Sequence, residues 1–124
     1  MNEHITLGPG GWAEVEIHKV TGICPVRAQV IGRRFAVHRR NADPDAYLWS
    51  VTHLRSGWRM PWSFNTPRQA QRFASSLSVL CDRRDIDLDT PDVFKVVSRL
   101  GSHREIHREI YALAADYSGT KESQ

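Results

Sequence analysis

The clearest pattern of hydrophobic and polar positions lies in residues 46–81, where two alternating segments precede a segment with helical spacing. A two-residue turn at Ser56-Gly57 places Trp49 opposite Phe64, and side chains alternate across each strand from there. Eight residues then share one face of the predicted hairpin, five of them large and apolar. They are Trp49, Val51, His53, Arg55, Trp58, Met60, Trp62 and Phe64.

Residues 66–81 have the spacing of an amphipathic helix with a clear beginning. Thr66 is a suitable N-cap, Pro67 fits the first helical position, and Gln69 completes a capping box. Apolar residues then recur every three or four positions, at Ala70, Phe73, Ala74, Leu77, Leu80 and Cys81. We expect this apolar stripe to pack against the apolar face of the hairpin.

Two earlier segments also alternate and predict further strands. Residues 12–20 read as a half-buried strand, and a glycine-first turn at Gly32-Arg33 predicts a tight hairpin over residues 26–39. In that register the hairpin has one apolar face and one basic face. The basic face holds Arg27, Gln29, Arg34, Ala36, His38 and Arg40, with Ile31 as its large apolar member.

These segments predict an α+β protein with a five-stranded (four to six) antiparallel sheet of hairpins. A long amphipathic helix covers one face of the sheet, and two C-terminal helices follow. Pro61 lacks a backbone N–H, which places strand 58–64 at an edge of the sheet. The expected boundaries are a flexible N-terminal arm at 1–11, one domain at 12–117 (sheet 12–64; helices 66–81, 91–100 and 103–117) and a disordered tail at 118–124.

Composition fits a single soluble domain. Of the 124 residues, 40% are hydrophobic and 25% are charged, which is ordinary for a globular protein. No apolar run approaches the length of a membrane span, and the first residues lack a signal-peptide core. We therefore expect a cytoplasmic protein without a membrane partner.

Positive charge is concentrated in the first part of the chain. Residues 26–72 hold nine arginines and two aspartates, a net charge of +7, whereas residues 81–124 hold seven basic and nine acidic residues. Arginine suits bidentate contacts with phosphate, but a GC-rich genome also enriches arginine. The charge distribution thus favours a nucleic-acid partner without requiring one.

A cationic sheet surface is the main candidate site, because such a surface can follow a phosphate backbone while aromatic side chains stack on bases. Trp12, Trp58 or Tyr47 would supply the stacking. Pairing of the arginines with Glu14 and Glu16 would instead make this an ordinary solvated face. The candidate nucleic-acid-binding residues are Arg27, Arg33, Arg34, His38, Arg39, Arg40, Arg55 and Arg59.

The layout of antiparallel strands followed by a crossing helix, over residues 12–81, resembles that of Whirly-type single-stranded DNA-binding proteins. This resemblance is architectural and rests on no diagnostic motif. In size and character the chain is also similar to phage- and plasmid-encoded accessory factors, including anti-CRISPR and anti-restriction inhibitors. The first resemblance implies binding of single-stranded DNA. The second implies protein–protein binding to a nucleic-acid-processing complex. The arginine-rich sheet face itself predicts binding of nucleic acid, with single-stranded DNA or RNA favoured over a sequence-specific duplex.

Catalytic and metal-binding patterns are weak. His103 and His107 have the i, i+4 spacing of two metal ligands, but glutamate does not follow the first histidine as in the zincin motif. No phosphate loop or nucleophile motif is present. We therefore predict a non-enzymatic protein without a cofactor. A homodimer, if one forms, is expected to use the two C-terminal helices, because Pro61 hinders strand addition at 58–64.

Overall fold

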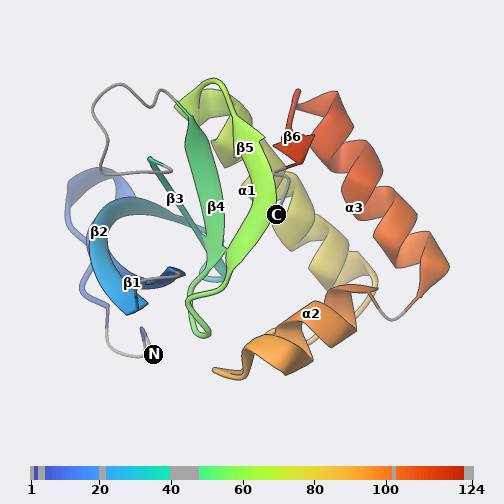
Figure 1. Cartoon of the computed structure of the whole chain (residues 1–124), viewed down its shortest axis with the longest axis horizontal. Helices are drawn as coiled ribbons and strands as arrows, with labels where there is room; N and C mark the ends of the chain where they lie inside the picture. The colour runs from blue at the N-terminus through green and yellow to red at the C-terminus, as the bar shows by residue number, and fades with distance from the viewer. Residues whose placement is uncertain (1, 3–4, 20–21, 40–47, 102, 122–124) are drawn as a thin grey trace.

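The computed structural model describes residues 2, 5–19, 22–39, 48–101 and 103–121 (Figure 1). Within these residues the fold is α+β, as predicted, with six antiparallel strands in sequential order and three helices. The strands are β1 (Trp12–Lys19), β2 (Gly22–Ile31), β3 (Phe35–Arg39), β4 (Trp49–His53), β5 (Arg59–Phe64) and β6 (Thr120–Lys121). The helices are α1 (Pro67–Arg83), α2 (Val93–Gly101) and α3 (Arg104–Asp116), preceded at the N-terminal end by a 3-10 turn at Pro9–Gly11. In the part of the chain that is described, no helix has the length and apolar character needed to cross a membrane.

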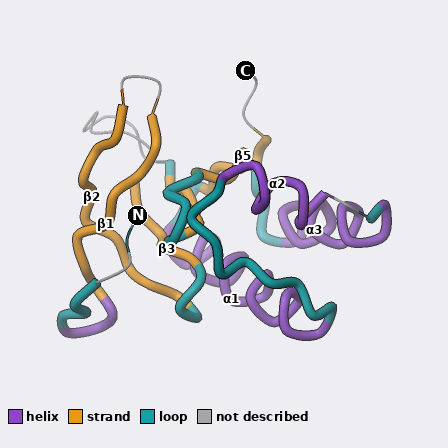
Figure 2. Tube along the Cα trace, turned by 90° about the horizontal axis from the view of Figure 1, so that it is seen from below, coloured by secondary structure: helices purple, strands orange, loops and turns teal. Residues whose placement is uncertain are grey.

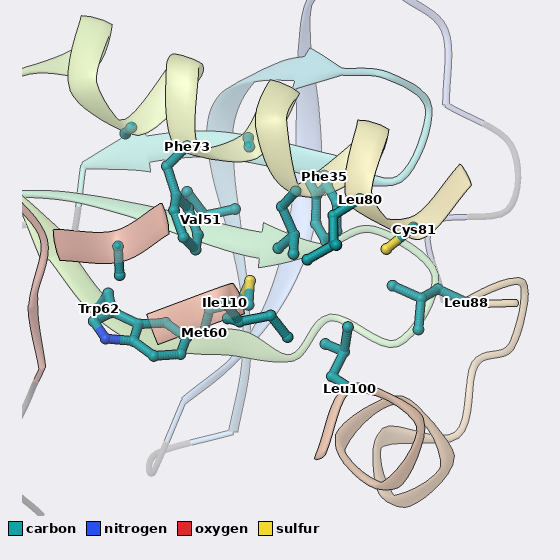
Figure 3. Packing of buried hydrophobic residues seen from close by; sticks show 14 of the residues in the cluster. Phe35, Val51, Met60, Trp62, Phe73, Leu80, Cys81, Leu88, Leu100 and Ile110 are labelled. Atoms are coloured by element: carbon teal, nitrogen blue, oxygen red, sulfur yellow. The ribbon is translucent and has the colours of Figure 1, made fainter. Parts of the chain in front are cut away.

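Helix α1 forms as the sequence predicts and covers one face of the sheet. The Thr66 hydroxyl accepts a hydrogen bond from the Gln69 backbone N–H at 3.1 Å, and the Gln69 side chain accepts one from the Thr66 N–H at 3.3 Å. The apolar stripe of the helix is buried, and Phe73 is its largest side chain (Figure 3). Its ring centroid lies 5.0 Å from that of Phe64 and 5.8 Å from that of Trp62, so α1 is held on the sheet by aromatic packing.

The central hairpin confirms the predicted buried face but not the predicted turn. Trp49 pairs with Phe64 as expected, whereas Thr52 pairs with Arg59 across a β-bulge, so a longer loop replaces the two-residue turn at Ser56-Gly57. The register shifts by two positions, and an even shift leaves every side chain on its original face. The apolar face of the sheet therefore still meets α1.

The hairpin of β2 and β3 differs from the prediction by one residue. Gly32 and Arg33 both have positive φ, 61° and 64°, and with Arg34 they form a three-residue loop that pairs Ile31 with Phe35. An odd shift turns one strand over relative to the other. Arg27 and His38, which were predicted to share a face, consequently lie on opposite faces of the sheet.

A second apolar cluster lies on the face of the sheet opposite α1. It is formed by Val15, Ile17, Ala28, Ala36 and Leu54. Figure 2 shows the β1–β2 hairpin on one side of β3 and the helices on the other. Both faces of the centre of the sheet are therefore covered, one by α1 and one by the curved β1–β2 hairpin.

The predicted ends of the domain require two corrections. Asn2 in the expected N-terminal arm donates to the backbone carbonyls of Glu16 (2.8 Å) and Leu54 (2.6 Å), and Ile5 packs on the second cluster, so this part of the chain lies against the sheet. In the expected disordered tail, Thr120–Lys121 form β6 and pair with β5. The strand 58–64 is therefore not the sheet edge, because Trp62 and Ser63, beyond Pro61, have pairing partners in β6. Residues 1, 3, 4 and 122–124 lie outside the described residues.

Two cysteines with different surroundings give a simple test of this packing. Cys81, on the apolar side of α1, is buried, and burial raises the pKa of its thiol to about 11, whereas Cys24 on β2 is half-buried. Only the thiolate reacts rapidly with alkylating reagents. We therefore expect Cys24 to be alkylated quickly at neutral pH and Cys81 to react slowly. Mass spectrometry of the native protein measures this. Equal labelling of both thiols would contradict the packing of α1.

Candidate nucleic-acid interface

The centre of the predicted basic outer face is buried and does not reach the protein surface. His38, Ser50 and Thr52 are fully buried, on the sheet face that carries the second apolar cluster. His38 Nε2 lies 2.7 Å from Thr52 Oγ1, and His38 Nδ1 lies 2.8 Å from the carbonyl oxygen of Arg39. The histidine is thus a hydrogen-bonded core residue, and the prediction that it lies on an exposed binding face is wrong. Arg59 is half-buried opposite Thr52, and Arg40 lies outside the described residues.

Arg34 and Arg55 connect the hairpin loops to the helical part of the fold. Arg34 donates to Asp82 Oδ1 at 2.5 Å and to Ser78 Oγ at 2.8 Å, both on α1. The hydrogen bond from Arg34 lowers the pKa of Asp82, and the same bond raises the pKa of Arg34. Arg55 donates to Asp89 Oδ1 at 2.6 Å in the segment before α2. Arg34 thus forms an ion pair with an aspartate of α1, and Arg55 forms one with an aspartate in the segment before α2.

Arg33 lies at the tip of the β2–β3 loop and is exposed. Together with Arg34 and Arg55 it borders an open cleft of about 710 Å³ between the two hairpin loops and the Ile86–Asp89 segment. The charges at this cleft are largely balanced by the ion pairs to Asp82 and Asp89. We therefore interpret the cleft as a junction between the sheet and the helical layer.

Two other arginines stack on tryptophan rings near the opposite end of the sheet. The guanidinium carbon of Arg27 lies 5.4 Å from the ring centroid of Trp12, and that of Arg39 lies 5.5 Å from the ring centroid of Trp49. Both arginines are exposed, and both indoles are half-buried. Each pair thus presents a charge and an aromatic ring to solvent.

The strand register places both pairs on the face that also carries α1. Trp12 pairs with Gln29 and Arg39 pairs with Trp49, while Gln71 on α1 donates to the Gln29 side chain at 2.5 Å. Trp49 also pairs with Phe64, the last residue of β5. The chain therefore enters α1 close to Trp49. Two exposed arginines, Arg68 and Arg72, lie in the first half of α1. We call Trp12, Arg27, Arg39 and Trp49, with Arg68 and Arg72 beside them, the Arg–Trp surface.

The structure thus divides the predicted site residues into separate groups. Arg27 and Arg39 are on one face, although the sequence placed them on opposite faces, whereas Arg33, Arg34 and Arg55 are at the hairpin loops. Trp12 was recognised as a candidate for stacking. Trp49 was missed, because the alternation assigned it to the core; it does pack on the core, but its ring also carries Arg39. Glu14 faces Arg27 across β1 and β2 and reduces the positive charge locally.

The histidines that suggested a metal site have other surroundings. His103 is the N-cap position of α3, and the His107 ring lies 4.5 Å from that of Tyr111. Among the described residues, no group of three or more potential metal ligands comes together. These observations give no support to a metal at His103 and His107.

Comparison with known proteins gives no match to a family model, to a curated protein or to a solved structure. The similarity to Whirly-type proteins therefore stays a prediction, made from the order of the antiparallel strands and the helix that follows them.

Proposed function

We propose that this chain is a non-enzymatic protein that binds single-stranded nucleic acid, DNA or RNA, through the Arg–Trp surface. The observation that supports this most directly is the pair of exposed arginines stacked on half-buried tryptophans on one sheet face. Single-strand binders combine cations that follow the phosphates with aromatic rings on which bases stack. The two Arg–Trp pairs supply both components next to each other.

The same geometry favours single strands over a duplex. Bases within a duplex are stacked on one another, so an indole face reaches a base only where the strand is open. Arg68 and Arg72 extend the cationic surface along α1 beyond the two tryptophans. In this proposal the strand runs across the end of the sheet and onto α1, and the protein acts in the cytoplasm.

Reversing the charge of both stacked arginines tests this proposal. We expect Arg27→Glu combined with Arg39→Glu to weaken binding of a labelled single-stranded oligonucleotide on the order of a hundredfold, because two charge-assisted contacts are lost. The slope of log affinity against log salt concentration should become shallower by about 0.7 for each phosphate contact removed. Fluorescence anisotropy over a salt series measures both quantities.

A matched control separates this site from general electrostatic attraction. Lys95→Glu combined with Arg108→Glu makes the same change in net charge at exposed positions of α2 and α3. We expect this control to bind nearly as the wild type does. Equal weakening by both double variants, or no binding by the wild type at low salt, would refute the Arg–Trp surface as a nucleic-acid site.

The alternative function is that of an accessory effector which binds a protein component of a nucleic-acid machine, in the manner of an anti-CRISPR or anti-restriction inhibitor. The Arg–Trp surface also favours this reading, because tryptophan and arginine are enriched among the energetically dominant residues of protein interfaces. Absence of nucleic-acid binding would support this alternative, and the partner would then present an acidic surface.

A further inference from the structure

Helix α2 exposes large apolar side chains that the fold does not cover. Phe94 is 87% exposed and Val97 is 43% exposed, although Val96 and Leu100 on the same helix are buried. Phe94, Val97 and Gly101 follow one another at helical spacing and form a stripe along one side of α2. Monomeric proteins expose single apolar residues often, but a fully exposed phenylalanine that continues into an apolar groove indicates a contact surface.

An apolar groove lies immediately beside this stripe, between α2, α3 and β5. Its volume is about 240 Å³, and its lining includes Trp58, Pro61, Val97, Gly101, Tyr111 and Lys121. The Tyr111 ring packs edge-on against Trp62 at 5.2 Å, which gives the groove a rigid aromatic wall. At Gly101 a Cβ atom would meet nothing within 4 Å, so the groove is open there.

We propose that the occupant of this groove is Phe94 of a second copy of the chain, so that the protein forms a two-fold symmetric dimer through α2. In an antiparallel pair of α2 helices centred on Val97, Phe94 of one copy lies opposite Leu100 of the other, beside the open position at Gly101. A two-fold axis makes the same contact twice, because each copy carries both the protruding ring and the groove. The groove is large enough for a phenyl ring, since an apolar cavity of about 150 Å³ accepts benzene.

The charges around the two surfaces are complementary in this arrangement. The groove is bordered by Lys121, and Arg104 is exposed at the beginning of α3. Asp92 precedes the protruding Phe94, and its carboxylate accepts the Phe94 backbone N–H at 2.9 Å. In the antiparallel register Asp92 of one copy lies beyond Gly101 of the other, near the beginning of α3. This complementarity between two parts of one chain favours a second copy over an unrelated peptide.

The experiment is sedimentation equilibrium of the full chain, over a concentration series and without nucleic acid. We expect the wild type to dimerise and Phe94→Ala to raise the dimer dissociation constant by about a hundredfold or more, because the ring is lost at both symmetric contacts. Val79→Ala is the control, since Val79 is a 60% exposed apolar residue on α1, and it should dimerise as the wild type does. Circular dichroism should show that both variants remain folded.

A mixing experiment identifies the groove. Gly101→Trp should fill the groove and abolish self-association while leaving Phe94 in place. Mixed with Phe94→Ala, it should form a heterodimer, because the first variant supplies the ring and the second supplies an open groove. A wild type that stays monomeric at every concentration, a Phe94→Ala variant that dimerises normally, or a mixture that does not associate would each refute the proposal. Since nucleic acid is absent, none of these results bears on the Arg–Trp surface.

Discussion

Replacing Phe73 with alanine is expected to lower the free energy of unfolding by about 3–5 kcal/mol, the range for removing a buried aromatic side chain. Phe73 is completely buried where α1 packs on the sheet. Its ring touches the aromatic rings of Phe64 and Trp62, both on β5. Truncation loses this packing and leaves a cavity that the rigid strand cannot close. Chemical denaturation followed by circular dichroism measures the loss.

Phe94→Ala is the matched control for this prediction. The chemical change is the same, but Phe94 is 87% exposed and contributes little to the folded core. We expect its unfolding free energy to stay within about 0.5 kcal/mol of the wild type at concentrations low enough to prevent self-association. Similar losses in the two variants would show that Phe73 does not hold α1 on the sheet.

Local sequence signals determine most of this fold. The Thr66-Pro67 cap and the six-residue apolar stripe predict α1 correctly because capping and amphipathic spacing are properties of the helix itself. The apolar face of β4 and β5 is also predicted correctly, although the turn is not, because an even register shift preserves the side-chain alternation. The capping, spacing and alternation that define these segments all involve residues close together in the sequence.

The β2–β3 turn shows where local signals fail. Glycine at the first turn position favours a two-residue turn, but here Arg33 also adopts positive φ, which few residues other than glycine adopt. The Arg34 side chain is hydrogen-bonded to Ser78 and Asp82, so contacts with α1, more than forty residues later in the chain, accompany the longer loop. This loop moves the register by one residue and reverses the predicted faces.

The candidate site was predicted less well than the fold for the same reason. The sequence contains an arginine-rich region, but which of its arginines share a surface depends on the pairing register of β2 and β3. His38 and Thr52 are buried on the sheet face that carries the second apolar cluster, and an alternating pattern does not show that this face is covered. The Arg39–Trp49 pair joins two strands separated by a long connection, so hairpin rules could not place these residues opposite each other.

Acidification is expected to destabilise the protein through His53. This residue on β4 is only 1% exposed, and its Nε2 donates to the carbonyl oxygen of Leu88 at 2.7 Å. Its Nδ1 lies 2.8 Å from Ser56 Oγ, which itself accepts from the Trp58 N–H, so the Ser56 hydroxyl donates to the ring. Both nitrogens of the neutral imidazole are therefore satisfied. Through the hydrogen bond to Leu88, this ring helps to hold the segment before α2 against β4.

Burial lowers the pKa of His53 below its usual value, and the nearby charge of Arg55 lowers it further, against opposing effects of the Leu88 hydrogen bond and Asp89. As the pH falls below about 6.5, His53 therefore binds a proton in the unfolded chain but not yet in the folded chain. Stability is complete above that pH and decreases below it, by up to about 1.4 kcal/mol for each pH unit, until the folded-state pKa is reached.

Denaturant unfolding at several pH values between about 5 and 8 measures this dependence, and His53→Gln identifies its source. Above pH 5 the ion-paired carboxylates Asp82 and Glu109, whose pKa values are lowered by Arg34 and Arg84, stay ionised and do not contribute to the change. The glutamine variant should be less stable at pH 8 but should lose less stability on acidification, because it has no imidazole to protonate. Parallel pH curves for the wild type and the variant would show that His53 is not the titrating group, since a buried neutral ring must produce a difference between them.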